Sequence, residues 1–150
     1  MSVSLYGSGN TIIQAVSVAA PFAASTSSTS YVTTGLSASI TPQSTNSKIL
    51  ILVSSTVGQA NYFDTCYYTI FRGTVSGTNL STATNAAFAY SYTATNAPAT
   101  NSIGLNFLDS PSTTSAVTYT VGFKVINGSN TAYFGNNCTS SITLLEVSGS

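Results

Sequence analysis

Apolar and polar residues alternate with a period of two along most of the chain, which is the pattern of strands with one face in a core. The alternation is clear at 36–41, 103–107 and 119–125 and imperfect at 11–18. No stretch of ten residues has the 3.6-residue period of an amphipathic helix. Clusters of turn-forming residues separate the runs. The pattern predicts an all-β jelly-roll sandwich of two antiparallel sheets with about 8–10 short strands.

The chain reads as a single domain of 150 residues, without a linker or an internal repeat. Residues 1–20 are predicted to be an N-terminal arm or first strand, and residues 21–150 the jelly-roll domain. Such an arm is long enough to add a strand to a partner protein. The clearest predicted hairpin returns from 119–125 to 131–134 through the Asn-Gly-Ser-Asn turn at 127–130.

Two segments carry apolar residues on both faces of a strand: the run 49–53 and the pair Leu144 and Leu145. A strand of a two-sheet sandwich has only one face on the core, and no predicted helix would cover the other face. We therefore expect copies of the same protein to cover it, although isolated apolar residues also occur on ordinary surfaces. The predicted subunit interface comprises Ile49, Leu50, Ile51, Leu52, Val53, Tyr119, Val121, Phe123, Leu144 and Leu145.

Charged residues make up only 4% of the chain, and the three basic and three acidic residues balance. A typical soluble domain has about 25%, and a surface so poor in charge favours association. Three scattered cations cannot form a phosphate-binding patch, so we expect no nucleic-acid partner. The absence of a polybasic segment and of a long apolar run likewise predicts no membrane partner.

The residue types needed for most catalysis are missing. The chain has no histidine, which excludes Ser-His-Asp and Cys-His arrangements and most metal sites. Asp64, Asp109 and Glu146 are dispersed, so we expect no catalytic, cofactor-binding or metal-binding residue and no enzymatic activity. Asp109 is predicted to open a turn, and Glu146 to meet a cation or solvent. Cys66 and Cys138 either lie as small apolar residues on strands or form a disulfide.

Tyrosines outside the core offer a different kind of site. Tyr62, Tyr90 and Tyr92 are candidate contacts for a glycan, because a tyrosine combines an apolar ring with a polar tip. Packing in the core or at an interface is the alternative for the same residues.

Four segments resemble small virion proteins and fibre tips of tailed bacteriophages, notably phages of cyanobacteria. They are SYVTTGLSASITP at 30–42, SKILILV at 47–53, FLDSPSTTSAVTY at 107–119 and SSITLLEV at 140–147, within a resemblance over 11–147. The resemblance implies a virion structural protein assembled in the host cytoplasm. The strand layout also resembles the jelly roll of tumour-necrosis-factor and complement-type globular heads. That likeness implies a homotrimer, with 49–57, 118–126 and 142–147 in the sheet that faces the threefold axis.

Two structural roles are compatible with the resemblance. The first is a trimeric capsid decoration (cement) protein that stabilises the shell by apolar packing against the major capsid protein or other virion proteins. The alternative is a tail-fibre or head-fibre tip that binds a host surface glycan. The chain has no repetitive shaft, which favours the decoration role.

Overall fold

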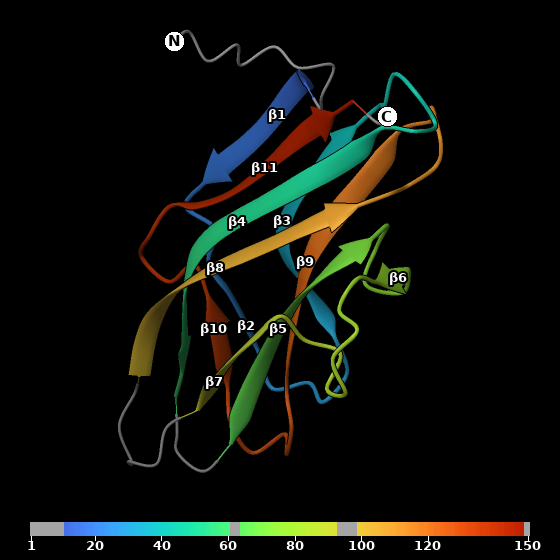
Figure 1. Cartoon of the computed structure of the whole chain (residues 1–150). Helices are drawn as coiled ribbons and strands as arrows, with labels where there is room; N and C mark the ends of the chain where they lie inside the picture. The colour runs from blue at the N-terminus through green and yellow to red at the C-terminus, as the bar shows by residue number, and fades with distance from the viewer. Residues whose placement is uncertain (1–10, 61–63, 93–98, 149–150) are drawn as a thin grey trace, which may run out of the picture.

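The structure of the chain, a computed structural model, describes residues 11–60, 64–92 and 99–148. Within these ranges every regular element is a strand, and the predicted all-β sandwich is confirmed (Figure 1). The eleven strands are β1 (Ile12–Ala20), β2 (Ala24–Thr26), β3 (Val32–Ile40), β4 (Lys48–Gln59), β5 (Thr65–Arg72), β6 (Thr78–Asn79), β7 (Ala89–Tyr92), β8 (Ala99–Asp109), β9 (Val117–Val125), β10 (Ala132–Phe134) and β11 (Ser140–Val147).

The strands form two antiparallel sheets that pack face to face. Sheet A has the order β1-β11-β4-β10-β2, and β8 pairs with the other edge of β4. Sheet B has the order β3-β9-β5-β6, and β7 pairs with β5. Without β2, β6 and β10, the order is β1-β11-β4-β8 in one layer and β3-β9-β5-β7 in the other. This is the order of a jelly roll, in which the chain passes repeatedly between the two sheets.

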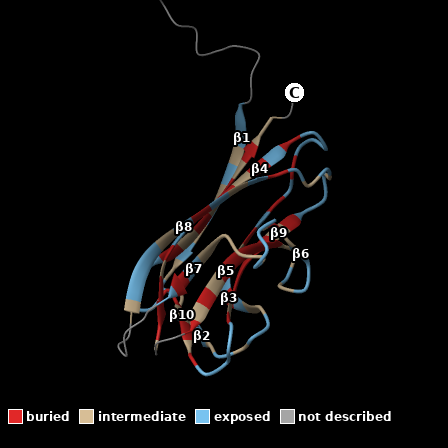
Figure 2. Ribbon diagram, turned by 60° about the horizontal axis from the view of Figure 1, so that its bottom comes forward, coloured by how far each residue is buried: buried red, intermediate tan, exposed pale blue. Residues whose placement is uncertain are grey.

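The core lies between the sheets and is built from the inward residues of the alternating strands (Figure 2). Phe123 of β9 lies at its centre, with its ring 6.4 Å from that of Tyr68 on β5 and 6.4 Å from that of Phe134 on β10. The Tyr68 hydroxyl is buried but donates to the backbone carbonyls of Gly58 and Tyr133. Its polar tip is thereby satisfied inside an apolar core.

The first strand belongs to the chain's own sandwich. β1 pairs with β11 without interruption from Gln14 to Ala20, with Ala15 opposite Leu145, and the register shifts at Ile13. The stretch 12–20 therefore adds a strand to sheet A of the same molecule, not to a partner protein. Residues 1–10 lie outside the described residues.

The predicted hairpin at 127–130 is wrong. The turn is present, with Gly128 at φ 70°, but the strand that follows it does not return along β9. Instead β10 pairs with β2 and β4 in sheet A, where Phe134 lies opposite Ala24 and Val57. Crossing to the other sheet buries Ala132 and Phe134 completely. Turn residues specify that the chain reverses, whereas burial decides which strand it reaches.

Candidate interaction surface

An uninterrupted row of aliphatic side chains crosses the outer face of sheet A. Ala15 of β1 lies opposite Leu145 of β11, Leu145 lies opposite Leu50 of β4, and Leu50 lies opposite Leu108 of β8. Directly opposite residues in neighbouring strands point to the same face. We call these four residues the aliphatic row. Leu52 is two residues from Leu50 on the same strand and therefore points to the same face.

The aliphatic row is open to solvent. Leu108 is 48% exposed and Leu52 39%, while Leu50 and Leu145 are half-buried. Figure 1 views this face directly, with β1, β11, β4 and β8 in front of the strands of sheet B. No described segment of the chain crosses over these four strands.

The rest of this outer face includes several hydroxylated side chains and is almost uncharged. Ser17 and Thr143 form a cross-strand hydrogen bond of 3.0 Å beside the aliphatic row. Lys48, at the start of β4, is the one charged residue on the outer face of sheet A among the described residues. A second copy of this face would therefore meet little charge repulsion.

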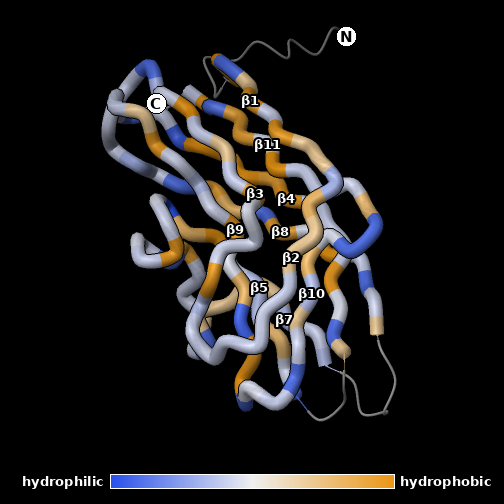
Figure 3. Tube along the Cα trace, turned by 180° about the vertical axis from the view of Figure 1, so that it is seen from behind, coloured by the Kyte–Doolittle hydropathy of each residue, from blue (hydrophilic) through white to orange (hydrophobic). Residues whose placement is uncertain are grey.

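The outer face of sheet B is different because the chain covers the middle of it. Thr69 and Phe71 point outward from β5, yet they are only 0% and 4% exposed. The segment between β5 and β7 lies over them: Thr69 donates to the Asn79 side chain at 2.7 Å, and the Tyr31 hydroxyl donates to the Ala86 carbonyl at 2.7 Å. One sheet thus supplies its own cover, and the other does not. Figure 3 views the molecule from the side opposite to that of Figure 1.

Only part of the predicted subunit interface is available to a partner. Both predicted segments, in β4 and β11, do carry apolar side chains on both faces, but alternate residues point into the chain's own core. Leu50, Leu52 and Leu145 point outward. The remaining seven are at most 4% exposed and are not available to a second subunit: Ile49, Ile51, Val53, Tyr119, Val121, Phe123 and Leu144.

The expected arrangement of strands around a threefold axis also needs correction. β4 and β11 lie in sheet A, but β9, the third strand assigned to that sheet, lies in sheet B. A strand with an apolar face and a polar face fits either layer of a sandwich, so periodicity cannot assign the sheet. Of these three strands, only β4 and β11 can therefore contribute to an interface on sheet A.

Asp109 forms a buried cross-link between the sheets. It accepts hydrogen bonds from Arg72 Nε at 2.8 Å and from the Tyr119 hydroxyl at 2.7 Å, and Arg72 also forms an ion pair with it. The hydrogen bond to Asp109 raises the pKa of Arg72, and burial followed by the Asp109 contact raises the pKa of Tyr119. The prediction that Asp109 opens a turn through backbone contacts is therefore wrong. Asp109 joins β8 of sheet A to β5 and β9 of sheet B.

Glu146 is also buried, at 0% exposure, although a cation or solvent contact was predicted. Its carboxylate accepts from Gln14 Nε2 at 2.6 Å and from the Gln43 backbone N–H at 2.7 Å. Burial raises the pKa of Glu146, but the polar groups of Ser47, Gln14, Gln43 and Ser44 lower it by more, and the net pKa is below its ordinary value. The buried Ser47 hydroxyl itself makes no hydrogen bond within the described residues. The site tethers the loop between β3 and β4.

Asp64 fastens the end of β9 to the start of β5. Its carboxylate accepts from the backbone N–H groups of Thr65 at 2.7 Å, Asn127 at 3.2 Å and Ile126 at 3.3 Å. Only 2% of the residue is exposed. With Asp64, Asp109 and Glu146 each enclosed by different partners, no two of them form a pair that could act on a substrate.

The two cysteines are free thiols, so the disulfide alternative is wrong. Cys66 is a buried strand residue whose thiol donates to Gln59 Oε1 at 3.3 Å, and burial raises its pKa to about 11. Cys138 is exposed and lies in the turn before β11, not on a strand.

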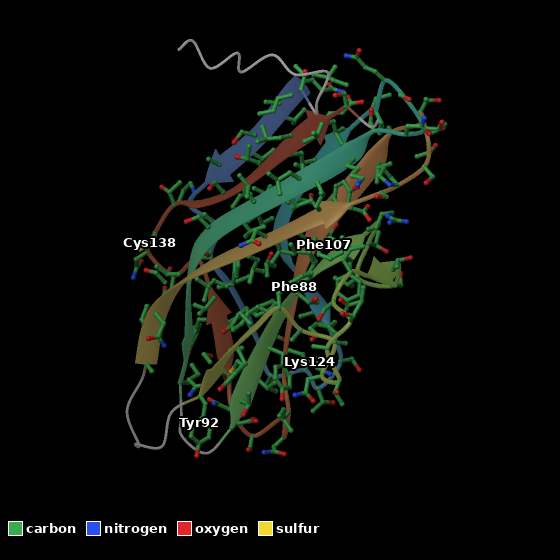
Figure 4. All side chains as sticks on the ribbon, in the orientation of Figure 1. Phe88, Tyr92, Phe107, Lys124 and Cys138 are labelled. Atoms are coloured by element: carbon green, nitrogen blue, oxygen red, sulfur yellow. The ribbon has the colours of Figure 1, made fainter. Side chains whose placement is uncertain are left out.

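Two of the three candidate glycan contacts lie on the surface, and the third lies outside the described residues. Tyr90 and Tyr92 of β7 are 68% and 51% exposed, and both point away from the core. Tyr92 is labelled in Figure 4, below Phe88 and Phe107, whose rings pack edge to face at 5.4 Å. Tyr62 lies outside the described residues. Phe88 itself is half-buried against the core.

Other features that could indicate a function class are few. Among the described residues, no three histidine, cysteine or acidic side chains gather as metal ligands would. The same residues contain no helix of the length and apolar character required to cross a bilayer. No protein-family model matches the sequence, and no curated protein matches it either. The open aliphatic row is therefore the feature that argues most directly for a function.

Proposed function

We propose that this protein is a non-enzymatic structural component of a bacteriophage particle that assembles as a homotrimer through the outer face of sheet A. The aliphatic row carries the proposal. Its four residues lie on four adjacent strands, so they form a flat apolar band and not a set of scattered side chains. Bands of this kind on small domains mark surfaces that bind other proteins.

A second copy of the chain is the occupant that fits best. The face holds one charged residue, Lys48, so the partner surface needs no complementary charge. Burying a leucine side chain fully contributes about 1.5–3 kcal/mol, and stable interfaces bury about 1,200–2,000 Å² in total. In a particle, symmetry adds further copies of each contact and raises the effective concentration of the partner surface.

The location in the particle is proposed from the resemblance together with this surface. As a capsid decoration protein, the trimer would lie on the shell and bridge neighbouring copies of the major capsid protein. A fibre tip that binds a host glycan is the second candidate, and the exposed Tyr90 and Tyr92 favour it. Counting copies per particle separates the two roles, since hundreds indicate the shell and a few to dozens indicate a fibre.

The substitution Leu52→Asp tests the assembly surface. It places a charge beside the aliphatic row at a residue already 39% exposed, so the fold should tolerate it. We expect the wild-type protein to have a trimer mass by light scattering, and Leu52→Asp to have a monomer mass with an unchanged circular dichroism spectrum. The matched control is Ser39→Asp, an exposed residue on the outer face of sheet B, which should remain trimeric.

A wild-type protein that stays monomeric at every concentration would overturn the proposal, and so would a Leu52→Asp variant that assembles normally. Leu144→Asp is not suitable for this test. Leu144 is 0% exposed within its own chain, so a charge there would unfold the sandwich whatever its assembly.

A further inference from the structure

We infer that the outer face of sheet B carries a second binding surface, a tyrosine strip that takes a carboxylated glycan. The inference goes beyond the assembly proposed above and applies to a shell protein and a fibre tip alike. The strip runs across three strands and the start of β3. Its members are Tyr90 of β7, Tyr67 of β5, Lys124 of β9 and Tyr31, directly before β3.

Strand pairing aligns the strip. Tyr90 lies opposite Tyr67, and Tyr67 lies opposite Lys124, so all three side chains point to one face. Strands lie about 4.8 Å apart, which puts Lys124 roughly 10 Å from Tyr90. The Lys124 ammonium is 4.7 Å from the centre of the Tyr31 ring and 5.8 Å from that of Tyr67. Lys124 and Tyr92 are both labelled at the lower end of the molecule in Figure 4.

The side chains of the strip are at least partly accessible. Tyr90 is 68% exposed, and Tyr67, Tyr31 and Lys124 are half-buried. Tyr31 is held in place by the hydrogen bond from its hydroxyl to the Ala86 carbonyl and by its edge-to-face contact with Phe71 at 5.4 Å. A fixed aromatic surface binds with little loss of side-chain entropy. A sugar ring complements such a surface because its C–H face is apolar and its rim carries hydroxyl groups.

The charges of the molecule specify an acidic ligand. All three carboxylates are buried, with Asp64, Asp109 and Glu146 at most 3% exposed. Within the described residues the one ion pair is that of Arg72 with Asp109, so no carboxylate lies within 4 Å of the Lys124 ammonium. Among the described residues, Lys124 is thus a cation that contacts aromatic rings and has no carboxylate partner. A carboxylate on the ligand would supply one, and the Lys124 ammonium has donors for it.

The probes for the test are oligogalacturonate, oligomannuronate and hyaluronan fragments, with the methyl ester of oligogalacturonate as a neutral counterpart. Binding is followed by tyrosine fluorescence, since the chain has nine tyrosines and no tryptophan, and is checked by calorimetry. We expect at least one carboxylated probe to bind. Its Kd should rise at least tenfold in Tyr90→Ala and in Lys124→Met.

The matched control is Lys48→Met, which removes the same charge from the outer face of sheet A and should leave the Kd unchanged. Three outcomes would overturn the inference: no binding of any carboxylated probe, equal binding of the neutral ester, or unchanged affinity in Tyr90→Ala. The oligomeric state is measured on the same samples. Because the strip and the aliphatic row lie on opposite sheets, a failure of glycan binding can be distinguished from a failure of assembly.

Discussion

At the scale of residues, the notable property is that a chain with so few charges buries all of its acids. Asp64 binds backbone N–H groups, Asp109 binds Arg72 and Tyr119, and Glu146 binds a glutamine and a backbone N–H. A buried carboxylate is tolerated only when it is paired or hydrogen-bonded. Each acid therefore stabilises a particular junction of the sandwich, and its removal should have a measurable effect on stability.

The junction at Asp109 can be tested with a double-mutant cycle. Arg72→Met leaves the buried carboxylate with one side-chain donor, Tyr119, and should lower the free energy of unfolding by about 1–3 kcal/mol. Arg72 is one-third exposed, which keeps the loss below that of a fully buried pair. Combining it with Asp109→Asn should cost less than the sum of the two single changes in urea titrations. Strict additivity would show that the two side chains are energetically independent.

Glu146 should make the protein sensitive to acid. Because its pKa in the folded chain is lowered from 4.5, the carboxylate stabilises the fold fully above that ordinary value. This contribution is lost as the pH falls below 4.5 and through the lowered pKa. We expect Glu146→Gln to be less stable than the wild type at pH 7, and the difference to shrink as the pH falls toward 3. A difference that stays constant over that interval in urea titrations would contradict this role.

At the scale of elements, β4 organises sheet A because it pairs with three strands. β8 follows one edge of it, while β11 and then β10 share the other edge. The switch from β10 to β11 takes place at the turn 135–139, which returns the chain to the same edge of β4. The Gly135 N–H donates to the Thr56 carbonyl at 2.7 Å and so attaches this turn to β4.

Gly135 should therefore be the least replaceable glycine of the turns. Its φ is 71°, and a Cβ there would lie 1.9 Å from the Phe22 carbonyl oxygen. Gly128 has φ 70°, but the atom nearest to a Cβ there is at an ordinary van der Waals distance of 3.5 Å, so it is the matched control. We expect Gly128→Ala to cost about 1–2 kcal/mol for its backbone conformation. Gly135→Ala should cost at least about 2 kcal/mol more by chemical denaturation; equal costs would mean that the Phe22 contact is relieved without strain.

At the scale of the whole molecule, the two outer faces are specialised differently. Sheet A exposes an aliphatic, nearly uncharged band, whereas sheet B is covered in its middle by the chain and exposes tyrosines beside Lys124. Because the sheets lie back to back, assembly through one leaves the other accessible. A protein with this division could be part of a particle and still present a binding surface outward.

Assembly through sheet A should depend little on salt. Salt weakens attraction between charges, but the proposed contact contains aliphatic side chains and one lysine. We expect the assembled mass, measured by sedimentation, to stay the same between about 0.05 and 1 M NaCl. Dissociation at high salt would indicate that ion pairs hold the copies together, and would move the interface away from the aliphatic row.

Much of the fold could be predicted from local pattern. Alternation predicted the strands that became β1, β3, β8 and β9. These results depend only on the two-residue period of a strand. The same local pattern failed at the turn 127–130, since a reversal can lead either to the adjacent strand or to the opposite sheet.

The candidate surfaces were predictable only in part. The sequence identified strands with apolar residues on both faces, and it selected Tyr90 and Tyr92. It did not separate Leu50, Leu52 and Leu145 from the core members of the same strands. Nor did it find Ala15 and Leu108, because their membership in the aliphatic row depends on partners about 60 to 130 residues away along the chain.

The sequence by itself determined the class of the fold, the low charge and the lack of histidine, because periodicity and composition are properties of the chain. The tertiary structure alone decided which face of each strand meets the opposite sheet and which side chains become cross-strand neighbours. Those outcomes depend on the pairing of distant strands and on the burial of one sheet against the other. The aliphatic row, the tyrosine strip and the enclosed carboxylates all arise from that long-range pairing.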